Sequence, residues 1–266
     1  MRTLVIAEPG CTAEGDKNNM LRLLETAKAC GADVWKPQWT SDPASMCERR
    51  HIGRDHAQRG HYERAYGWLA FPVEWHQEFR TRCVELGMQY ACSVYLPQDV
   101  ATVEPFVDYH KVSSFEATDG EMIAAHRALT RQGNLIVSMG MVDDIDDLQN
   151  DWRGLRADYL HCVSAYPAPL SAMNLAVIDD LVDGLSDHSG CLVTGAVAVA
   201  LGAEIIETHY RLDDCNPDNP DYAVAFSPAE FTQYIKNIRD AELMLGDGIK
   251  RRQPCEEWAV PYRVVS

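Results

Sequence analysis

The sequence predicts an α/β protein built as a (β/α)8 TIM barrel, and three observations support this prediction. Short apolar, β-branched runs alternate along the whole chain with longer segments that have helical spacing. The runs are apolar throughout, as expected of parallel strands that are covered on both faces. Eight such pairs fit within 266 residues, a typical length for a closed barrel. A doubly wound open sheet is the alternative architecture.

The strands and helices are expected in strict alternation. The expected strands are residues 4–7, 33–36, 88–92, 109–112, 134–137, 159–162, 182–185 and 204–206. The clearest helices are expected at residues 17–30, 73–86, 119–131, 175–181, 190–201 and 228–245. In the first of these, Leu21, Leu24 and Ala27 recur at helical spacing, and Gly31 follows as a left-handed cap.

Two segments fall outside the alternation. Residues 40–71 form the longest stretch that is expected to be irregular, and loops of that length commonly act as lids or binding loops. Residues 247–266, which contain Pro254 and Pro261, are expected to form an extended arm. The predicted domain organisation is therefore a catalytic barrel over residues 1–246 and a C-terminal arm over residues 247–266.

Charge and cysteine content exclude several classes of protein. The chain has 40 acidic and 24 basic residues, and the net charge of −16 disfavours binding to nucleic acid or to anionic lipid. No run of about 18 apolar residues predicts a membrane-spanning helix, and no secretory signal is recognisable. The nine cysteines form no CxxC pair, which indicates reduced thiols in a cytoplasmic protein.

Polar residues stand where the expected strands end, and in a barrel that edge carries the chemistry. These residues are Glu8, Lys36, Gln38, Ser93, Lys111, Ser114, Glu116, Ser138, Ser164, Tyr166, Ser186, Asp187, His188 and His209. Lys36 and Lys111 both follow apolar runs, and with nearby serine hydroxyls they could hold a phosphate and a carboxylate. A Schiff-base lysine of an aldolase is the alternative at this stage.

His188 and His209 end two consecutive expected strands. Neighbouring strands lie about 5 Å apart, so both imidazoles could bind one metal ion. Asp187 and Glu207 stand beside them, and imidazole with oxygen ligands suits Mn, Fe, Co or Zn. The histidines at positions 51, 56, 61 and 76 are expected on exposed loops or helices.

Six collinear motifs carry a family resemblance. They are the segments at residues 6–10 (IAEPG), 27–38, 110–114 (HKVSS), 160–169 (LHCVSAYPAP), 184–189 (GLSDHS) and 198–209. In this order and over nearly the whole chain, they resemble the sialic acid synthase (N-acetylneuraminate synthase) family. The resemblance implies a TIM barrel that condenses phosphoenolpyruvate with an amino-sugar aldehyde to give a 2-keto sugar acid and phosphate.

The resemblance also implies roles for individual residues. Residues expected to hold phosphoenolpyruvate are Lys36, Gln38, Ser93, Lys111, Ser114, Ser138, Ser164 and Ser186. His188 and His209 would bind a divalent metal, usually manganese or magnesium in this family. Glu8, Glu116, Tyr166 and Asp221 match positions that face the sugar, and Glu8 is also a candidate for proton transfer.

The sequence departs from the family pattern mainly on the sugar side. Family members usually continue into an antifreeze-like domain that lends an arginine to a partner subunit, and that domain is expected to be missing here. Thr12 to Gly15 replace an Asn-His-x-Gly motif, Ser164 replaces an asparagine, and Thr208 replaces a basic residue. The same type of reaction on a different aldehyde is therefore expected, and a homodimer remains an open alternative.

Two other functions are compatible with the sequence. One is a metal-dependent or lysine-dependent pyruvate aldolase on the same barrel. The other is a non-catalytic relative that binds a sugar or phosphate ligand. Release of phosphate from phosphoenolpyruvate would separate the synthase from the aldolase, because an aldolase releases none.

Overall fold

The chain folds as a closed parallel barrel. The structure is a computed structural model that describes residues 2–53, 55–129, 134–178 and 181–264. Its strands are β1 (Leu4–Glu8), β2 (Val34–Trp35), β3 (Gln38–Trp39), β4 (Gln89–Val94), β5 (Tyr109–Val112), β6 (Asn134–Ser138), β7 (Ala157–Cys162), β8 (Gly184–Asp187) and β9 (Ile205–His209). Each pairs in parallel with its neighbours, and β1 joins β9 on one side and β2 on the other.

The nine strands occupy eight positions around the barrel, because β2 and β3 are two segments that share one position (one wall of the barrel). Both pair with β4, and Lys36 and Pro37 lie between them. Pro37 lacks the N–H that an unbroken ladder would use, which accounts for the interruption. The predicted (β/α)8 barrel is therefore confirmed.

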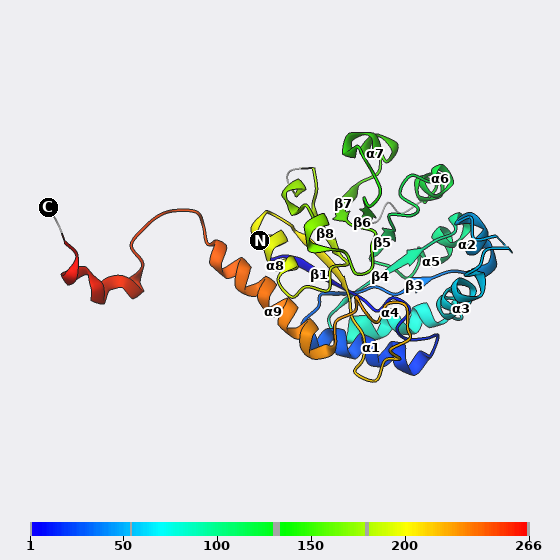
Figure 1. The fold of residues 1–266 in the computed structure, drawn as a ribbon, viewed down its shortest axis with the longest axis horizontal. Helices are drawn as coiled ribbons and strands as arrows, with labels where there is room; N and C mark the ends of the chain where they lie inside the picture. The colour runs from blue at the N-terminus through cyan, green and yellow to red at the C-terminus, as the bar shows by residue number, and fades with distance from the viewer. Residues whose placement is uncertain (1, 54, 130–133, 179–180, 265–266) are drawn as a thin grey trace.

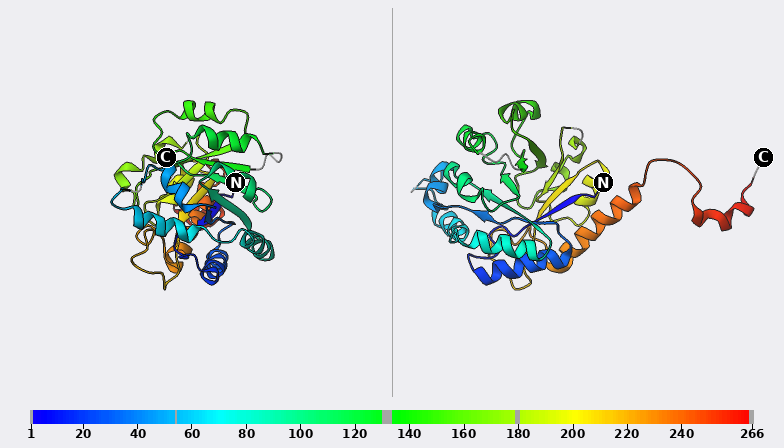
Figure 2. Two further views of the ribbon diagram at one scale, coloured as in Figure 1. Left: turned by 90° about the vertical axis from the view of Figure 1, so that its right-hand side faces the viewer. Right: turned by 180° about the vertical axis from the view of Figure 1, so that it is seen from behind.

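The helices lie outside the strands, as Figures 1 and 2 show. They are α1 (Lys17–Cys30), α2 (Pro43–Arg49), α3 (Arg59–Leu69), α4 (Trp75–Glu85), α5 (Pro97–Val103), α6 (Gly120–Arg127), α7 (Ile145–Asp151), α8 (Thr194–Ala200) and α9 (Pro228–Leu245). The bounds of α1 match the prediction. Asp16 caps its first turn by accepting the Asn19 N–H, and Gly31 ends it with a φ of 99°.

Each strand buries both of its faces. Side chains that point outward, such as Val5 and Trp35, join the large core between the strands and the helices. Alternate side chains point inward and form a separate cluster that fills the lower part of the barrel. That inner cluster is Ile6, Val34, Ala91, Ile136, Leu160 and Ile205. The barrel therefore has a packed apolar floor beneath the carboxyl ends of its strands.

The segment at residues 40–71 is largely helical, so the expectation of an irregular stretch was wrong. Asp42 caps α2 by accepting the Ala44 and Ser45 N–H groups, and Pro43 occupies the first turn. Together with residues of α3, α2 forms a second small core. These helices are short and pack on each other, which weakens their periodic signal in the sequence.

The helix expected at residues 175–181 is absent from its described part. Two 3-10 turns, η1 (Leu170–Ala172) and η2 (Leu175–Val177), replace it, and residues 179–180 lie outside the described residues. Asn174 adopts a positive φ of 42° immediately before η2. This left-handed residue prevents η1 and η2 from merging into one helix.

His76 was also expected on the surface but is fully buried. Its Nδ1 lies 2.7 Å from the Tyr90 hydroxyl, and its ring packs against the rings of Trp39, Phe71 and Phe106. The sequence places His76 in the first turn of α4, where a polar residue usually faces solvent.

The chain continues past α9 into a segment that lies away from the barrel (Figure 1). Within it, η3 (Pro254–Tyr262) is a 3-10 helix, and both Trp258 and Tyr262 are exposed. All nine cysteines are free. None of the helices in the described ranges has the length and apolar character needed to cross a lipid bilayer.

Candidate active site

A cavity of about 370 Å³ opens at the carboxyl ends of the strands. Three of the predicted residues do not line it: Glu116 and Ser164 lie just behind its wall, and Asp187 accepts hydrogen bonds from the Tyr234 hydroxyl at 2.7 Å and the Ser189 N–H at 2.8 Å. The lining residues that were predicted are Glu8, Lys36, Gln38, Ser93, Lys111, Ser114, Ser138, Tyr166, Ser186, His188, His209 and Asp221.

The two-residue period of the strands explains why these side chains meet. On most walls, the polar residue stands two positions after an inward apolar residue, as in Val34 and Lys36 or Ala91 and Ser93. Strand register then sets the neighbours, so that Ser93 lies opposite Lys111. A ring of polar side chains thus sits directly above the apolar floor.

Lys36 is held by two carboxylates. Its ammonium donates to the Ser93 hydroxyl at 2.8 Å, forms an ion pair with Glu8, and lies 3.9 Å from Glu207 Oε2. The side chain is only 2% exposed. Burial alone would lower its pKa, but the charges of Glu207 and Glu8 outweigh burial and raise the pKa above its ordinary value. Lys36 is therefore a fixed positive charge.

Lys111 is equally buried but has different partners. Its Nζ donates to the Ser138 hydroxyl at 2.7 Å and to the Val112 carbonyl at 2.9 Å. Burial lowers its pKa, and the charge of Glu207 offsets this only in part. The cavity therefore contains two chemically distinct amines.

Glu207 is a lining residue that the site prediction omitted. Its Oε1 accepts a hydrogen bond from the Ser186 hydroxyl at 3.1 Å, whereas its buried Oε2 accepts none. Burial opposes its ionisation, but Lys111 and Lys36 together lower its pKa to about 2. The signal was present in the sequence, because Glu207 shares a strand face with Ile205 and His209.

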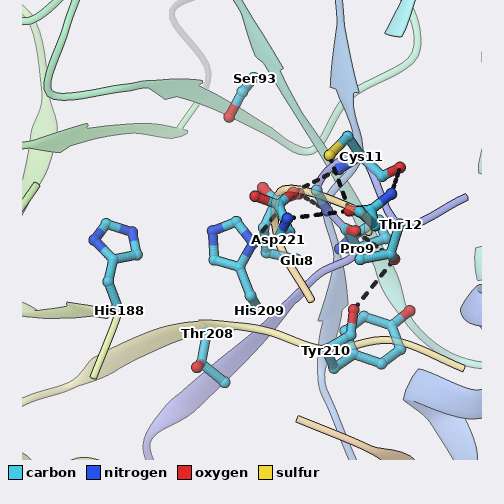
Figure 3. Close-up of polar contacts among 12 residues, drawn as sticks. Glu8, Pro9, Cys11, Thr12, Ser93, His188, Thr208, His209, Tyr210 and Asp221 are labelled. Atoms are coloured by element: carbon cyan, nitrogen blue, oxygen red, sulfur yellow. Dashed lines mark hydrogen bonds and ion pairs between the residues drawn. The ribbon is translucent and has the colours of Figure 1, made fainter. Parts of the chain in front are cut away.

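The two predicted metal ligands lie side by side, with ring centroids 5.6 Å apart (Figure 3). His188 Nδ1 donates to the Val163 carbonyl at 2.9 Å, a tautomer assigned from this contact, and its Nε2, an acceptor in that tautomer, lies 3.4 Å from the Ser186 hydroxyl. Burial and the neighbouring His209 lower the pKa of His188 to about 4. His188 is thus a neutral imidazole at pH 7.

His209 presents a buried nitrogen that makes no hydrogen bond. This atom, Nδ1, lies 3.9 Å from Asp221 Oδ2. The described residues contain no group of three or more His, Cys, Asp or Glu side chains arranged to hold a metal ion. The protein would therefore supply two imidazole ligands, and oxygen atoms of water or substrate would complete the coordination.

The loop after β1 fixes the two carboxylates near the histidines. Glu8 Oε1 accepts the Gly10 N–H at 2.6 Å, and Asp221 Oδ2 accepts the Cys11 N–H at 2.8 Å. Gly10 has a φ of +55°, and a side chain there would overlap the Asp221 carboxylate. Burial raises the pKa of Glu8, although Lys36 acts in the opposite direction.

Ser164 and Glu116 act from behind the wall. The Ser164 hydroxyl shares a 2.8 Å hydrogen bond with Ser114, which does line the cavity. Glu116 binds Ser113 and Arg50. The structure therefore gives Ser164 and Glu116 supporting positions, with no surface of their own in the cavity.

The segment at residues 40–71 supplies lining residues that sequence analysis did not assign. From α3 and the residues before it come Arg50, His61, Tyr62, Ala65, Tyr66 and Leu69. Tyr95 and Phe115 complete this outer part of the cavity. Most of these are aromatic side chains, with one arginine and two aliphatic residues, and they form no recognisable motif, so only the fold could place them.

Comparisons with known proteins identify the family of this chain. The family model described as NeuB family matches residues 23–250. The N,N'-diacetyllegionaminic acid synthase of Campylobacter jejuni is 27% identical over 96% of this chain and 81% of its own length. The N-acetylneuraminate-9-phosphate synthase of Mus musculus is 27% identical over 95% of this chain and 74% of its own.

Solved structures show the same fold. A sialic acid synthetase from Leptospira borgpetersenii, crystallised with citrate, superposes with a TM-score of 0.80 at 22% identity, covering 99% of this chain and 92% of that one. The resemblance seen in the motifs is thus confirmed by the match over residues 23–250, and the chain belongs to the NeuB family.

Proposed function

We propose that the protein is a synthase that condenses phosphoenolpyruvate with an aldehyde. The products would be a 2-keto-3-deoxy acid and inorganic phosphate. The observation that carries this proposal is the meeting of buried Lys36 and Lys111 with His188 and His209 in one cavity. The relatives named as sugar acid synthases support it further.

The inner part of the cavity suits a small substrate with two anionic groups. Lys36 and Lys111 supply charge-assisted donors for a phosphate and a carboxylate. Serine hydroxyls surround both amines and can complete the binding of the oxygens. Those hydroxyls belong to Ser93, Ser114, Ser138 and Ser186.

In the proposed reaction, C3 of the enol phosphate forms a bond to the aldehyde carbon, and the aldehyde oxygen takes up a proton. Water adds to C2, and the C2–O bond to the phosphate then breaks. The keto group of the product forms at C2, and its oxygen comes from that water. Glu8, beside Lys36 at the base of the cavity, is positioned to take up or release the protons.

We infer that a divalent metal, manganese or magnesium, is bound by His188 and His209. The buried Nδ1 of His209 makes no hydrogen bond, and the Nε2 of His188 has a long 3.4 Å contact with the Ser186 hydroxyl, so both nitrogens can serve as metal ligands. Two nitrogen ligands favour manganese over magnesium, which prefers oxygen. When bound, the metal would polarise the aldehyde oxygen and make its carbon electrophilic.

The decisive experiment measures three quantities together. The enzyme is incubated with manganese, phosphoenolpyruvate and a panel of aldehydes, and phosphoenolpyruvate loss, phosphate and 2-keto acid are quantified. We expect equal amounts of all three. With ¹⁸O in the bridging oxygen of phosphoenolpyruvate, the label should leave with phosphate. Keto acid formed from pyruvate without phosphate release would contradict the proposal.

One observation favours a second candidate, a lysine-dependent pyruvate aldolase. Lys111 has a lowered pKa, and its Nζ bonds only to a hydroxyl and a carbonyl, as a Schiff-base amine requires. Borohydride reduction in the presence of pyruvate would then attach a three-carbon adduct to Lys111, detectable by peptide mass spectrometry. Tight binding of phosphoenolpyruvate without turnover of any aldehyde would instead favour a non-catalytic relative.

A further inference from the structure

Asp187 is a buried carboxylate that the proposed reaction leaves unused. It ends β8, directly before His188, and its side chain is fully buried. Ser186 and His188 line the cavity on either side of it in the chain, but Asp187 does not. Its carboxylate instead contacts Tyr234 on α9, outside the barrel wall. Because a buried carboxylate is costly unless hydrogen bonds satisfy it, its partners indicate its role.

Neutral groups donate the hydrogen bonds that Asp187 accepts. The Tyr234 hydroxyl donates to Oδ2 at 2.7 Å, and the Ser189 N–H donates to Oδ1 at 2.8 Å. Thr208, which stands where the family pattern has a basic residue, points away from the histidine rings (Figure 3), and its hydroxyl donates to the Asp187 main-chain carbonyl at 3.2 Å. Tyr234 is therefore the donor to this carboxylate that comes from a distant segment.

Hydrogen bonds also fix His188 in its loop. Its Nδ1 donates to the Val163 carbonyl, and its own carbonyl accepts the Ala168 N–H at 2.8 Å. Asp187 precedes His188 and binds the N–H of Ser189, which follows it. The Asp187 carboxylate therefore holds the backbone on both sides of His188. A shift of this carboxylate would change the position of the imidazole.

The helices α8 and α9 fix the Tyr234 hydroxyl. The Tyr234 side chain is fully buried, and its ring centroid lies 4.9 Å from that of Phe226. Gly195, in the first turn of α8, approaches it closely, because a Cβ at position 195 would stand 2.5 Å from the hydroxyl oxygen. The packing of these helices thus sets the position of a carboxylate next to a predicted metal ligand.

We propose that Tyr234 is a positioning residue for the metal site. Its hydroxyl holds Asp187, and Asp187 holds His188 in place to bind the divalent ion. This inference rests on the metal binding by His188 and His209 in the proposed function. Tyr234 does not line the cavity, so it acts through Asp187 and not on the ion or a substrate. Loss of a residue that supports a metal ligand commonly lowers metal affinity about 10–100-fold.

The test measures manganese binding by the metal-free protein, without phosphoenolpyruvate or aldehyde. Calorimetric titration gives Kd for manganese, and denaturant unfolding gives the stability of the same metal-free sample. Tyr234→Phe keeps the ring that packs on Phe226 and removes the hydroxyl. We expect its Kd for manganese to be at least about tenfold higher than that of the parent.

Tyr90→Phe is the matched control. Tyr90 is also fully buried, and its hydroxyl lies 2.7 Å from His76 Nδ1, away from the cavity. Both variants therefore lose one buried hydroxyl and its hydrogen bond, and we expect both to lose stability. Tyr90→Phe should keep the parental Kd within about twofold. A difference in Kd between the two variants separates positioning of the metal ligand from a general loss of stability.

A second variant moves the hydroxyl without removing it. A methyl group in Gly195→Ala would overlap the Tyr234 hydroxyl, so its hydrogen bond to Asp187 must shift. We expect Kd for manganese to rise in Gly195→Ala as well. Gly120→Ala is its control, because nothing lies within 4 Å of a Cβ there, and it should keep the parental Kd.

The outcomes separate this inference from the proposed function. An unchanged Kd in Tyr234→Phe, or an equal rise in Tyr90→Phe, would overturn the inference and leave the metal site standing. No binding of manganese by the parent protein would overturn the metal assignment and this inference together. The synthase function is judged separately, by the consumption of phosphoenolpyruvate, which the titration does not require.

Discussion

Lys36 and Glu207 stand with their charged atoms 3.9 Å apart inside the barrel, although β1 lies between their strands. Glu8, on β1 itself, pairs with the same ammonium. One lysine therefore balances two buried carboxylates. Removing Lys36 would leave like charges facing each other without water to screen them.

Lys36→Met should mainly impair the use of phosphoenolpyruvate. We expect kcat/KM for phosphoenolpyruvate to fall at least ~30-fold, since loss of a buried charge partner costs about 2–5 kcal/mol. KM for the acceptor should change only a few-fold. Initial rates and calorimetric titration with phosphoenolpyruvate measure the two effects.

A control variant guards against a general loss of stability. Lys28→Met removes an exposed lysine on α1 and should keep parental kinetics. Parental kcat and KM for phosphoenolpyruvate in Lys36→Met would remove Lys36 from the binding site.

His188→Ala and His209→Ala should each abolish turnover and leave the fold intact. Changes to residues that only support metal ligands cost about 10–100-fold, so loss of a ligand should cost more than ~100-fold. Metal content, circular dichroism and activity in chelator-treated buffer are measured together. Near-parental activity of either variant in that buffer would show that the metal assignment is wrong.

Gly140→Ala should disturb phosphate binding without touching a charged residue. A Cβ at position 140 would stand 2.7 Å from Cys162 Sγ and would overlap the Ser164 hydroxyl, so the Ser114–Ser164 hydrogen bond must shift. We expect KM for phosphoenolpyruvate to rise roughly tenfold, the equivalent of about one lost hydrogen bond.

Gly120→Ala is the control for this steric effect. Nothing lies within 4 Å of a Cβ at Gly120, at the start of α6, so its kinetics should match those of the parent. If Gly140→Ala binds phosphoenolpyruvate equally well, Ser114, as held by Ser164, does not contact it.

Stability should decline as pH falls from about 6.5 to 4. Burial lowers the pKa of His76, His126 and His188 to about 4, whereas an unfolded chain titrates them near 6.5. In that range the unfolded chain binds more protons, so the stability present above pH 6.5 is lost as pH decreases.

The variant His76→Gln isolates one of these contributions. Denaturant unfolding at several pH values should show that the parent loses about 2–3 kcal/mol more than His76→Gln between pH 7 and pH 4. If the free energy of unfolding depends on pH in the same way in both proteins, His76 takes up a proton in the folded state as readily as in the unfolded chain.

The sequence was sufficient to predict the strands and the residues at their ends. An apolar run that ends in Lys36 or Ser138 predicts a strand. Because the period of a strand is two residues, the run also predicts which face of the strand the side chain of Lys36 or Ser138 occupies. Glu207 was noted beside the histidines but was given no role in the site, although it obeys the same rule, because a glutamate between Ile206 and Thr208 suits a solvent-exposed edge equally well.

The outer part of the cavity, which α3 and the residues before it line, could not be predicted in the same way. Arg50 and Tyr66 reach it through the packing of α2 on α3, and neither helix has a strong period in its sequence. His76 shows the same limit, because its burial depends on Phe71 and Phe106 from other segments. Contacts between distant segments leave no local pattern to detect.

The apolar floor, which includes Ile6, Val34 and Ile136, closes the lower part of the barrel, so a substrate would enter the cavity from the carboxyl ends of the strands. The amines of Lys36 and Lys111 lie between that floor and the mouth of the cavity. An acceptor bound at the mouth would block the access of phosphoenolpyruvate to them. For the proposed reaction, the order of addition is therefore compulsory, with the three-carbon substrate first and the aldehyde second. An acceptor analogue should then act as an uncompetitive inhibitor against phosphoenolpyruvate.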